Sequence, residues 1–296
     1  MSKIIRTPES RFENLEGYNF QANYVEVADG LSMHYVDEGG KDKPVILLLH
    51  GEPSWSYLYR KMIPILAKEG FRVIAPDLIG FGKSDKLTEQ SDYSFQTHID
   101  WMTAFLDKLA LKDIHLFCQD WGGLIGLRIV ANMPDRFSKI VASNTGLPTG
   151  KGEPSKTFMA WREFSQKSPH FDIGSVISMG TVQTLSKEVL AAYNAPFPSE
   201  EYAACARIFP SLVPINEEET EAQNNAKAWK VLMQWEKPFL TIFGDADKVT
   251  AGADKLFQKL IPGAAGHKHQ MLSAGHFIQE EVGEELAGLI AEFYKE

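Results

Sequence analysis

The feature of this sequence that most constrains its fold is a series of short apolar runs that alternate with helix-like segments. The runs cover residues 44–49, 71–75, 113–118, 139–143, 239–243 and 268–272. A strand buried on both faces gives a continuous apolar run of this length. The intervening helix-like segments cover residues 57–68, 95–109, 122–133, 254–260 and 277–294. This order predicts an α/β fold in which a mostly parallel sheet carries helices on both faces.

Two further β-like runs come before this series, at residues 23–27 and 31–36. They flank Asp29-Gly30, a tight-turn dipeptide, so they are predicted to form a hairpin of antiparallel edge strands. The hairpin brings the predicted sheet to eight strands. Ser94 is the predicted N-cap of the helix at residues 95–109.

The interval between the fourth and fifth apolar runs of the series breaks the alternation. It reads as short helices separated by Pro154, Pro169, Pro196, Pro198, Pro210 and Pro214. An insertion at this point of an α/β sheet is expected to cover the carboxyl ends of the strands, where such sheets bind their ligands. We therefore expect a core domain at residues 1–146 and 234–296 and a helical cap at residues 147–233.

Charge and composition exclude several classes of function. The 296 residues carry a formal net charge of −9, and the chain has no lysine or arginine cluster. Such a surface repels nucleic acid and anionic lipid. No segment approaches the roughly 18 apolar residues that cross a bilayer. Cys118 and Cys205 do not suggest a disulfide framework, so we expect a cytoplasmic protein. We also expect a monomer that acts on a small-molecule substrate.

The motif Cys118-Gln119-Asp120-Trp121-Gly122-Gly123 lies between a predicted strand and a predicted helix. In α/β hydrolases the nucleophile sits on a sharp strand-to-helix turn flanked by small residues, and Asp120 occupies that position here. The serine motif Gly-x-Ser-x-Gly is missing from the sequence. A carboxylate is ionised at neutral pH, so it can displace a leaving group without a base and become an alkyl ester. The alternative is that Asp120 only caps the following helix.

A base and an orienting acid are expected further along the chain. His276 follows the last predicted strand, where this fold places the base that activates water, although an ordinary loop histidine is the alternative. Asp245 and Asp247 both follow the strand before it, and we favour Asp247 as the acid that orients the imidazole. Asn144, at the other position where relatives place this acid, is an amide and cannot supply the charge.

The turn His50-Gly51-Glu52-Pro53 follows the first long apolar run. Its shape can direct the backbone N–H of Glu52 toward the site. Together with the backbone N–H of Trp121, it is expected to form an oxyanion hole, although a plain tight turn looks similar. His267 and His269 lack a third ligand, and the turn at residues 80–85 is not a phosphate loop, so we expect neither a metal nor a cofactor.

Taken together, four motifs resemble those of the haloalkane dehalogenases, in the branch that carries its acid after the seventh strand. They are residues 50–55, 77–85, 118–123 and 274–277, and the resemblance extends from about residue 24 to residue 293. It implies hydrolysis of a small apolar halogenated substrate, with a halide ion as a product. It also implies a halide site between the indole N–H groups of Trp121 and Trp161, and an apolar pocket lined by Phe158, Phe209, Val213 and Val249.

Two alternatives remain open from the sequence. An epoxide hydrolase also uses an aspartate on this turn, with cap tyrosines to activate the epoxide oxygen, and Tyr193 and Tyr202 are available. A non-catalytic receptor built on the same fold is the other alternative.

Overall fold

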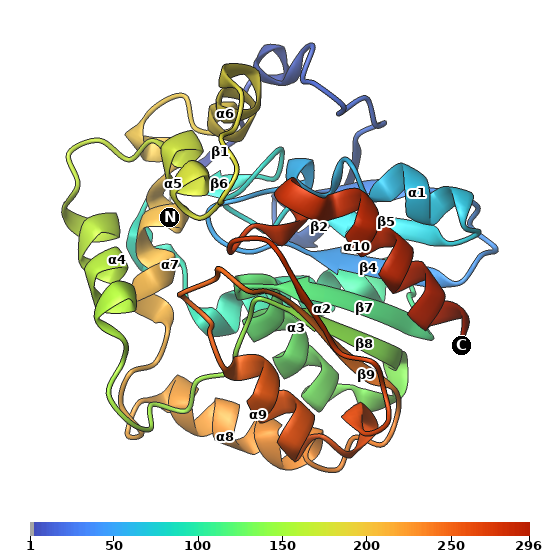
Figure 1. Cartoon of the computed structure of the whole chain (residues 1–296). Coiled ribbons are helices and arrows are strands. Elements are labelled where there is room, and N and C mark those ends of the chain that lie inside the picture. The colour runs from blue at the N-terminus through green and yellow to red at the C-terminus, as the bar shows by residue number, and fades with distance from the viewer. Residues whose placement is uncertain (1–2) are drawn as a thin grey trace.

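The computed structural model describes residues 3–296, so only the first two residues of the predicted core segment 1–146 lie outside it. Eight strands form the main sheet (Figure 1). In spatial order they are β10 (Gln270–Leu272), β9 (Phe239–Gly244), β8 (Phe137–Ser143), β7 (Ile114–Gln119), β4 (Val45–Leu49), β5 (Arg72–Pro76), β3 (Leu31–Glu38) and β2 (Asn23–Ala28). The strands from β10 to β5 run parallel, while β3 and β2 are antiparallel to their neighbours. The predicted α/β architecture and its hairpin are confirmed.

Helices cover both faces of this sheet (Figure 1). Those of the α/β alternation are α1 (Ile63–Lys68), α2 (Phe95–Lys108), α3 (Trp121–Asn132), α9 (Ala253–Leu260) and α10 (Ile278–Lys295). Helices α1 and α10 pack against each other on one face, and α2 packs against α3 on the other. The strands between them contribute almost entirely buried residues, which is why they read as unbroken apolar runs in the sequence.

Five α-helices lie between β8 and β9, in the interval where the alternation breaks. They are α4 (Lys156–Lys167), α5 (Ile173–Met179), α6 (Lys187–Asn194), α7 (Ala204–Leu212) and α8 (Thr220–Leu232). Helices α4 and α7 pack together, as do α5 and α6, whereas α8 packs against α3 of the sheet layer. Serine or aspartate side chains cap the N-termini of α4, α5 and α6 and accept a backbone N–H in each case.

The structure differs from the sequence-based prediction near residues 57–68. A single helix was expected, but a short 3-10 helix at Ser56–Tyr59 comes first and α1 begins only at Ile63. Pro64 lies in the first turn of α1, where its missing N–H and fixed φ are tolerated. A continuous helix through Pro64 would lose a backbone hydrogen bond and bring the ring against the preceding turn. The sequence also gave no sign of a small antiparallel pair, β1 (Ile4–Ile5) with β6 (Lys86–Leu87).

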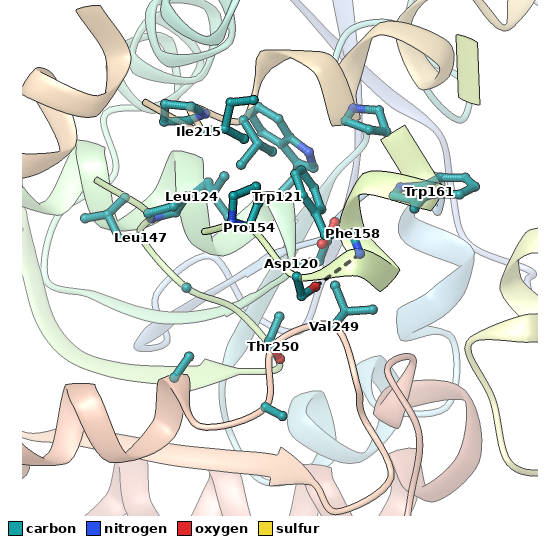
Figure 2. A pocket seen from close by; sticks show the side chains of 18 of the residues that line it. Asp120, Trp121, Leu124, Leu147, Pro154, Phe158, Trp161, Ile215, Val249 and Thr250 are labelled. Carbon is teal, nitrogen blue, oxygen red and sulfur yellow. Dashed lines mark hydrogen bonds between the residues drawn. The ribbon is translucent and has the colours of Figure 1, made fainter. Parts of the chain in front are cut away.

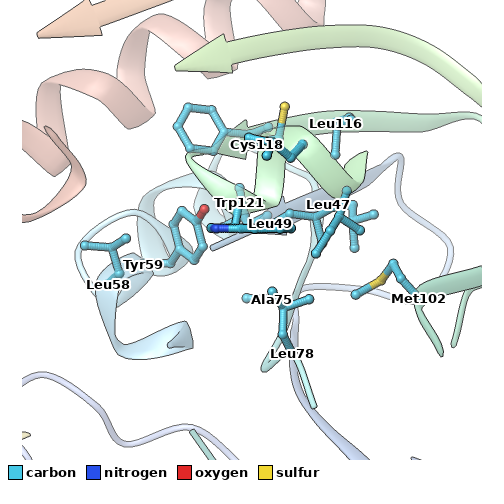
Figure 3. Close-up of a cluster of buried hydrophobic side chains, with 14 of the residues drawn as sticks. Leu47, Leu49, Leu58, Tyr59, Ala75, Leu78, Met102, Leu116, Cys118 and Trp121 are labelled. Carbon is cyan, nitrogen blue, oxygen red and sulfur yellow. The ribbon is translucent and has the colours of Figure 1, made fainter. Parts of the chain in front are cut away.

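The hydrophobic core continues directly beneath the turn between β7 and α3. Figure 3 shows Trp121 and Cys118 among the side chains of Leu47, Leu49 and Leu116, all of them buried. Deep burial on both sides of this turn leaves little freedom for Asp120 to move. The helix α2 begins as predicted: Ser94 accepts the N–H of Thr97, and Thr97 accepts the N–H of Ser94 in return.

Among residues 3–296, none of the helices combines the length and the hydropathy that crossing a bilayer requires.

Candidate active site

Asp120 occupies the single residue between β7 and α3, with φ of 51° and ψ of −125°. This is a conformation that residues other than glycine rarely adopt, and it stores backbone strain. The two following glycines make the turn possible. A Cβ on Gly122 would overlap the main-chain carbonyl of Leu49, and a Cβ on Gly123 would overlap the side chain of Thr145. The sequence motif therefore produces a sharp turn that presents Asp120 at the carboxyl edge of the sheet.

Two neighbouring elements contact the Asp120 carboxylate. The backbone N–H of Glu52, just after β4, donates to Oδ1 at 2.8 Å. The Nε2 atom of His276, just before α10, lies 3.4 Å from Oδ2. A Cβ on Gly51 would overlap this carboxylate, so the loop can approach it only because glycine stands there. Asp120, Glu52 and His276 therefore lie together, although they come from distant parts of the chain.

His276 lies between two carboxylates. Its Nδ1 is 3.1 Å from Oδ2 of Asp247, and the Asp247 carboxylate also accepts hydrogen bonds from the Val249 N–H and the Thr250 hydroxyl. Burial disfavours the charged imidazole, but Asp247 and Asp120 outweigh it and raise the pKa of His276 to about 10. Burial alone would raise the pKa of Asp247, yet His276 lowers it to about 2. Asp245 is exposed at the surface.

A buried histidine that the sequence analysis left without a role supports the turn after β4. The Nε2 atom of His50 accepts the N–H of Leu78 at 2.9 Å, so its proton must reside on Nδ1. That Nδ1 lies 3.0 Å from the carbonyl of Gly51 and donates to it. His50 thereby fixes the residue that precedes Glu52. The position of His50 directly after β4 is the one feature of the sequence that could have indicated this supporting role.

The side chain of Glu52 is buried at the cavity wall. Burial first, and the Asp120 charge second, raise its pKa well above the usual range of a carboxyl group, while the nearby His276 and Trp161 act in the opposite direction. Burial and the Asp120 charge therefore favour the neutral form of the Glu52 side chain.

A cavity of about 520 Å³ opens in front of Asp120. Asp120, Trp121, Trp161 and His276 all line it, as do Phe158, Val213 and Val249. Figure 2 shows Phe158 and Trp161 on one side of Asp120, with Val249 on another. The cavity lies between the strand ends and the helices α4, α5 and α7, each of which contributes to its wall.

Phe209 does not lie where the sequence analysis placed it. Its side chain is fully buried, and its ring packs behind Trp121 with the ring centres 4.4 Å apart and the planes tilted by 31°. Its ring also packs against Phe81 and His98, with ring centres 5.0 Å and 4.6 Å apart, respectively. The prediction that Phe209 lines the cavity is wrong in this structure, because the inward face of α7 packs into the core instead. Phe209 instead supports the inner side of Trp121.

The two tryptophans predicted to bind halide differ in their surroundings. Trp121 is buried, with Phe95 at 5.0 Å on one side and Phe209 on the other. Trp161 is only partly buried on α4, where it stacks with Phe164 and Phe171, each at 5.8 Å. Trp229 also lines the cavity, but its indole N–H donates to the carbonyl of Leu147 at 2.8 Å. The indole donor of Trp229 is therefore already used within the protein.

The tyrosines considered for epoxide activation are also placed by the structure. Tyr193 is fully buried in α6, and its hydroxyl donates to Glu280 at 2.5 Å. Glu280 in turn forms a two-pronged pair with Arg60, with both bonds at 2.6 Å. Tyr202 lies in a short 3-10 helix at Glu200–Tyr202. The Tyr193 hydroxyl is thus committed to a buried ion pair and does not point to the cavity.

Both cysteines are free and fully buried. Cys118 is on β7, two residues before Asp120, and Cys205 is on α7. Burial raises the pKa of each thiol well above its ordinary value.

The fold and this arrangement of residues define the class of protein. The family model of the alpha/beta hydrolase fold matches residues 44–282. The chain is therefore an α/β hydrolase with an aspartate at the nucleophile position.

Closer relatives narrow the class. The chain is 54% identical to a haloalkane dehalogenase of Psychrobacter cryohalolentis, with 98% of each protein covered. It is 52% identical to a haloalkane dehalogenase of Mycolicibacterium paratuberculosis, with 96% of each covered. The solved structure of the tetrameric haloalkane dehalogenase DpaA from Paraglaciecola agarilytica superimposes with a TM-score of 0.90, at 36% identity and with 97% of each chain covered. The chain belongs to the haloalkane dehalogenases.

Proposed function

We propose that this enzyme hydrolyses haloalkanes to an alcohol, a halide ion and a proton through an ester formed on Asp120. The observation that carries the proposal is the arrangement at the carboxylate. Asp120 stands at the edge of an apolar cavity, with the Glu52 N–H at 2.8 Å and His276 at 3.4 Å. A single side chain thus faces the substrate space on one side and a base on the other.

In the first step, a carboxylate oxygen of Asp120 attacks the carbon that bears the halogen. A C–O bond forms, the C–halogen bond breaks, and its electron pair leaves with the halide. The indole N–H groups of Trp121 and Trp161 are the proposed donors to that anion. Indole suits this role because it donates a hydrogen bond without offering an acceptor that would repel the halide.

In the second step, His276 takes a proton from water, and the resulting oxygen attacks the carbonyl carbon of the ester. The backbone N–H groups of Glu52 and Trp121 are the proposed donors to the tetrahedral oxyanion. Collapse of this intermediate breaks the bond between the carbonyl carbon and the alkyl oxygen, and the His276 imidazolium protonates the departing alkoxide to give the alcohol. Asp120 is left as a carboxylic acid and loses its proton to solvent, which accounts for the proton released. Asp247 stabilises the imidazolium that forms meanwhile.

The same geometry explains how His276 can act as a base only when it is needed. With both carboxylates ionised, its pKa is about 10, so it is protonated at neutral pH. Esterification removes the negative charge of Asp120, and this loss lowers the pKa of His276 toward neutrality. The alkylation step itself thereby prepares the base for the hydrolysis step.

Replacing His276 with Phe tests the division between the two steps. Alkylation by a bromoalkane should still proceed and release one equivalent of bromide per site, but the ester should persist. Intact-mass spectrometry would detect the alkyl adduct, and peptide mapping would place it on Asp120. Asp245→Asn, at an exposed carboxylate after the same strand as Asp247, serves as the control and should turn over like the wild type. An unmodified mass under saturating substrate would contradict the proposal, and diol formation from an epoxide would favour the alternative.

We also propose that residues 147–233 act as a cap over the strand ends. The contribution of α4, α5 and α7 to the cavity wall supports this division, while α8 packs on α3 within the sheet layer. A cytoplasmic location is proposed on the basis of the two free, buried cysteines. The monomeric state stays a prediction, to be compared by sedimentation velocity with the tetramer described for the relative from Paraglaciecola agarilytica.

A further inference from the structure

Two buried amide side chains hold the loop that carries His276. Gln119, the last residue of β7, is fully buried, and its Nε2 donates to the main-chain carbonyl of His276 at 3.1 Å. Asn144, just after β8, donates to the same carbonyl at 2.9 Å and to that of Gly275 at 2.8 Å. The Oδ1 atom of Asn144 accepts the N–H of Gly244 at 2.7 Å. The ends of three neighbouring strands are thus tied to the residue proposed as the base.

Gln119 makes an additional contact that Asn144 does not. Its Nε2 lies 3.1 Å from Nε2 of the His276 imidazole ring. The orientation of the Gln119 amide is determined by the His276 carbonyl, which can only accept a hydrogen bond. The Gln119 NH₂ group therefore faces the ring, while its Oε1 is buried and has no hydrogen-bond partner among residues 3–296.

An N–H donor next to Nε2 can bond only to a ring nitrogen that carries no proton. This is the state of neutral imidazole with its proton on Nδ1, the form that donates to Asp247 and can take a proton from water. In the imidazolium, the Nε2–H would face the NH₂ group of Gln119, and two donors would repel each other. The contact therefore favours the form of His276 that acts as a base.

The charged groups that face His276 act in the opposite direction. Asp120 on the sharp turn and Asp247 after β9 favour the imidazolium, while burial and Asp120 favour the neutral form of Glu52 after β4. Once Asp120 has been esterified, only Asp247 remains as an ionised neighbour of the ring. At that stage the Gln119 amide opposes the one charge that still favours the imidazolium.

We propose that Gln119 is a positioning residue for ester hydrolysis, because its amide N–H stabilises the unprotonated Nε2 of His276 after Asp120 has been alkylated. The inference rests on the roles proposed above for Asp120 and His276. Gln119 exchanges no proton itself. Nε2 accepts from the attacking water and from this N–H together, and the bond to the His276 carbonyl keeps the amide in place.

The test compares Gln119→Met with Gln279→Met. Gln279 is a fully buried glutamine three residues after His276, on α10, so its variant carries the same change in chemistry without the contact to the ring. Quench-flow with a bromoalkane, between pH 6 and pH 10, separates the burst of bromide from the decay of the alkyl-enzyme mass. Rates are expressed per active site from the burst amplitude, so a partly folded preparation does not bias them.

We expect Gln119→Met to leave the alkylation rate within about threefold of the wild type and to slow ester hydrolysis about tenfold at pH 7, the effect of losing one hydrogen bond. The pH profile of hydrolysis should move up by as much as about one unit. KM should fall together with kcat, because the ester accumulates. Gln279→Met should keep the wild-type profile.

A second substitution guards against poor folding of the Met variant. Gln119→Glu removes the same donor and adds a negative charge beside the ring, so its hydrolysis profile should move further toward high pH. An unchanged profile in both Gln119 variants, or an equal shift in Gln279→Met, would overturn the inference. If no alkyl-enzyme forms even in the wild type, the proposed function fails instead.

Discussion

The proposed catalytic triad consists of Asp120, His276 and Asp247. Asp120 and His276 border the same cavity as helix α4, yet the triad and the helix are packed in opposite ways. Asp247 and His276 are buried, and each is held by several hydrogen bonds: Asp247 by its own loop and by His276, and the His276 carbonyl by Gln119 and Asn144. Of the twelve residues of α4, only Ser165 is buried, and the apolar side chains of Met159 and Phe164 are 37% and 40% exposed. The comparison teaches that the geometry of the reaction is fixed by the core, while one wall of the substrate space is formed by a helix with little packing behind it.

The largest effect is expected from removing the side chain that is proposed to react. Asp120→Ala should reduce halide release by at least about 10⁴-fold, because a covalent nucleophile is removed and water cannot replace it within the cavity. Steady-state halide release measures the loss. Asp245→Ala, two residues before Asp247 and exposed, should retain the wild-type rate. Substantial turnover by Asp120→Ala would show that the core site is not the reacting centre.

A stability comparison tests the difference in packing directly. Phe209→Ala should lower the free energy of unfolding by roughly 3–5 kcal/mol, because it leaves a cavity behind Trp121. Phe164→Ala on α4 should change it by no more than about 1 kcal/mol, since the ring is partly exposed. Urea unfolding followed by circular dichroism gives both values. Equal losses would mean that α4 is as firmly packed as the core.

Trp121 in the core and Trp161 on α4 allow the same comparison between two residues that are proposed for one role. Trp121→Phe and Trp161→Phe should each slow alkylation about 100-fold, the effect of removing one donor from a developing anion. Only Trp121→Phe should also lower the melting temperature, because Trp121 is buried between Phe95 and Phe209. Stopped-flow bromide release and thermal unfolding provide the two measurements. A normal alkylation rate in Trp161→Phe would remove α4 from the halide site.

The last comparison concerns pH and stability. The pKa of His276 is raised to about 10 in the folded protein, against an ordinary value of about 6.5 in the unfolded chain. The ion pairs of His276 therefore contribute their full stability below pH 6.5 and lose it as the pH rises toward 10. The stability of the wild type relative to His276→Phe should decline across this window. A constant difference between pH 6.5 and pH 10 would contradict the paired imidazolium.

The same contrast explains what could be predicted from the sequence. Strands such as β4 and β7 were found within a residue or two, because burial on both faces leaves a local signal in the apolar run. The turn at Asp120 was found because its backbone requires small neighbours at set positions. Asp247 and His276 follow strand ends, so their meeting could be anticipated from topology before any distance was known.

The remaining features depend on contacts between distant residues, which leave no local pattern. Phe209 was placed in the cavity on the family resemblance, and the local sequence does not show whether its ring points to substrate or to Trp121. Likewise, nothing around Gln119 indicates that its amide reaches a ring 157 positions away. Short helices were expected in the cap, but the exposure of α4 depends on how little of the chain packs behind it.

The burial of both thiols has a consequence for an enzyme of this class. Haloalkanes are alkylating agents, and a thiolate is a stronger nucleophile toward them than a carboxylate. Cys118, beneath the turn, and Cys205, on α7, are both inaccessible and kept protonated. The substrate therefore meets the carboxylate of Asp120, whose ester His276 is proposed to hydrolyse, and does not meet a thiolate, whose alkylation would give a thioether that hydrolysis cannot reverse.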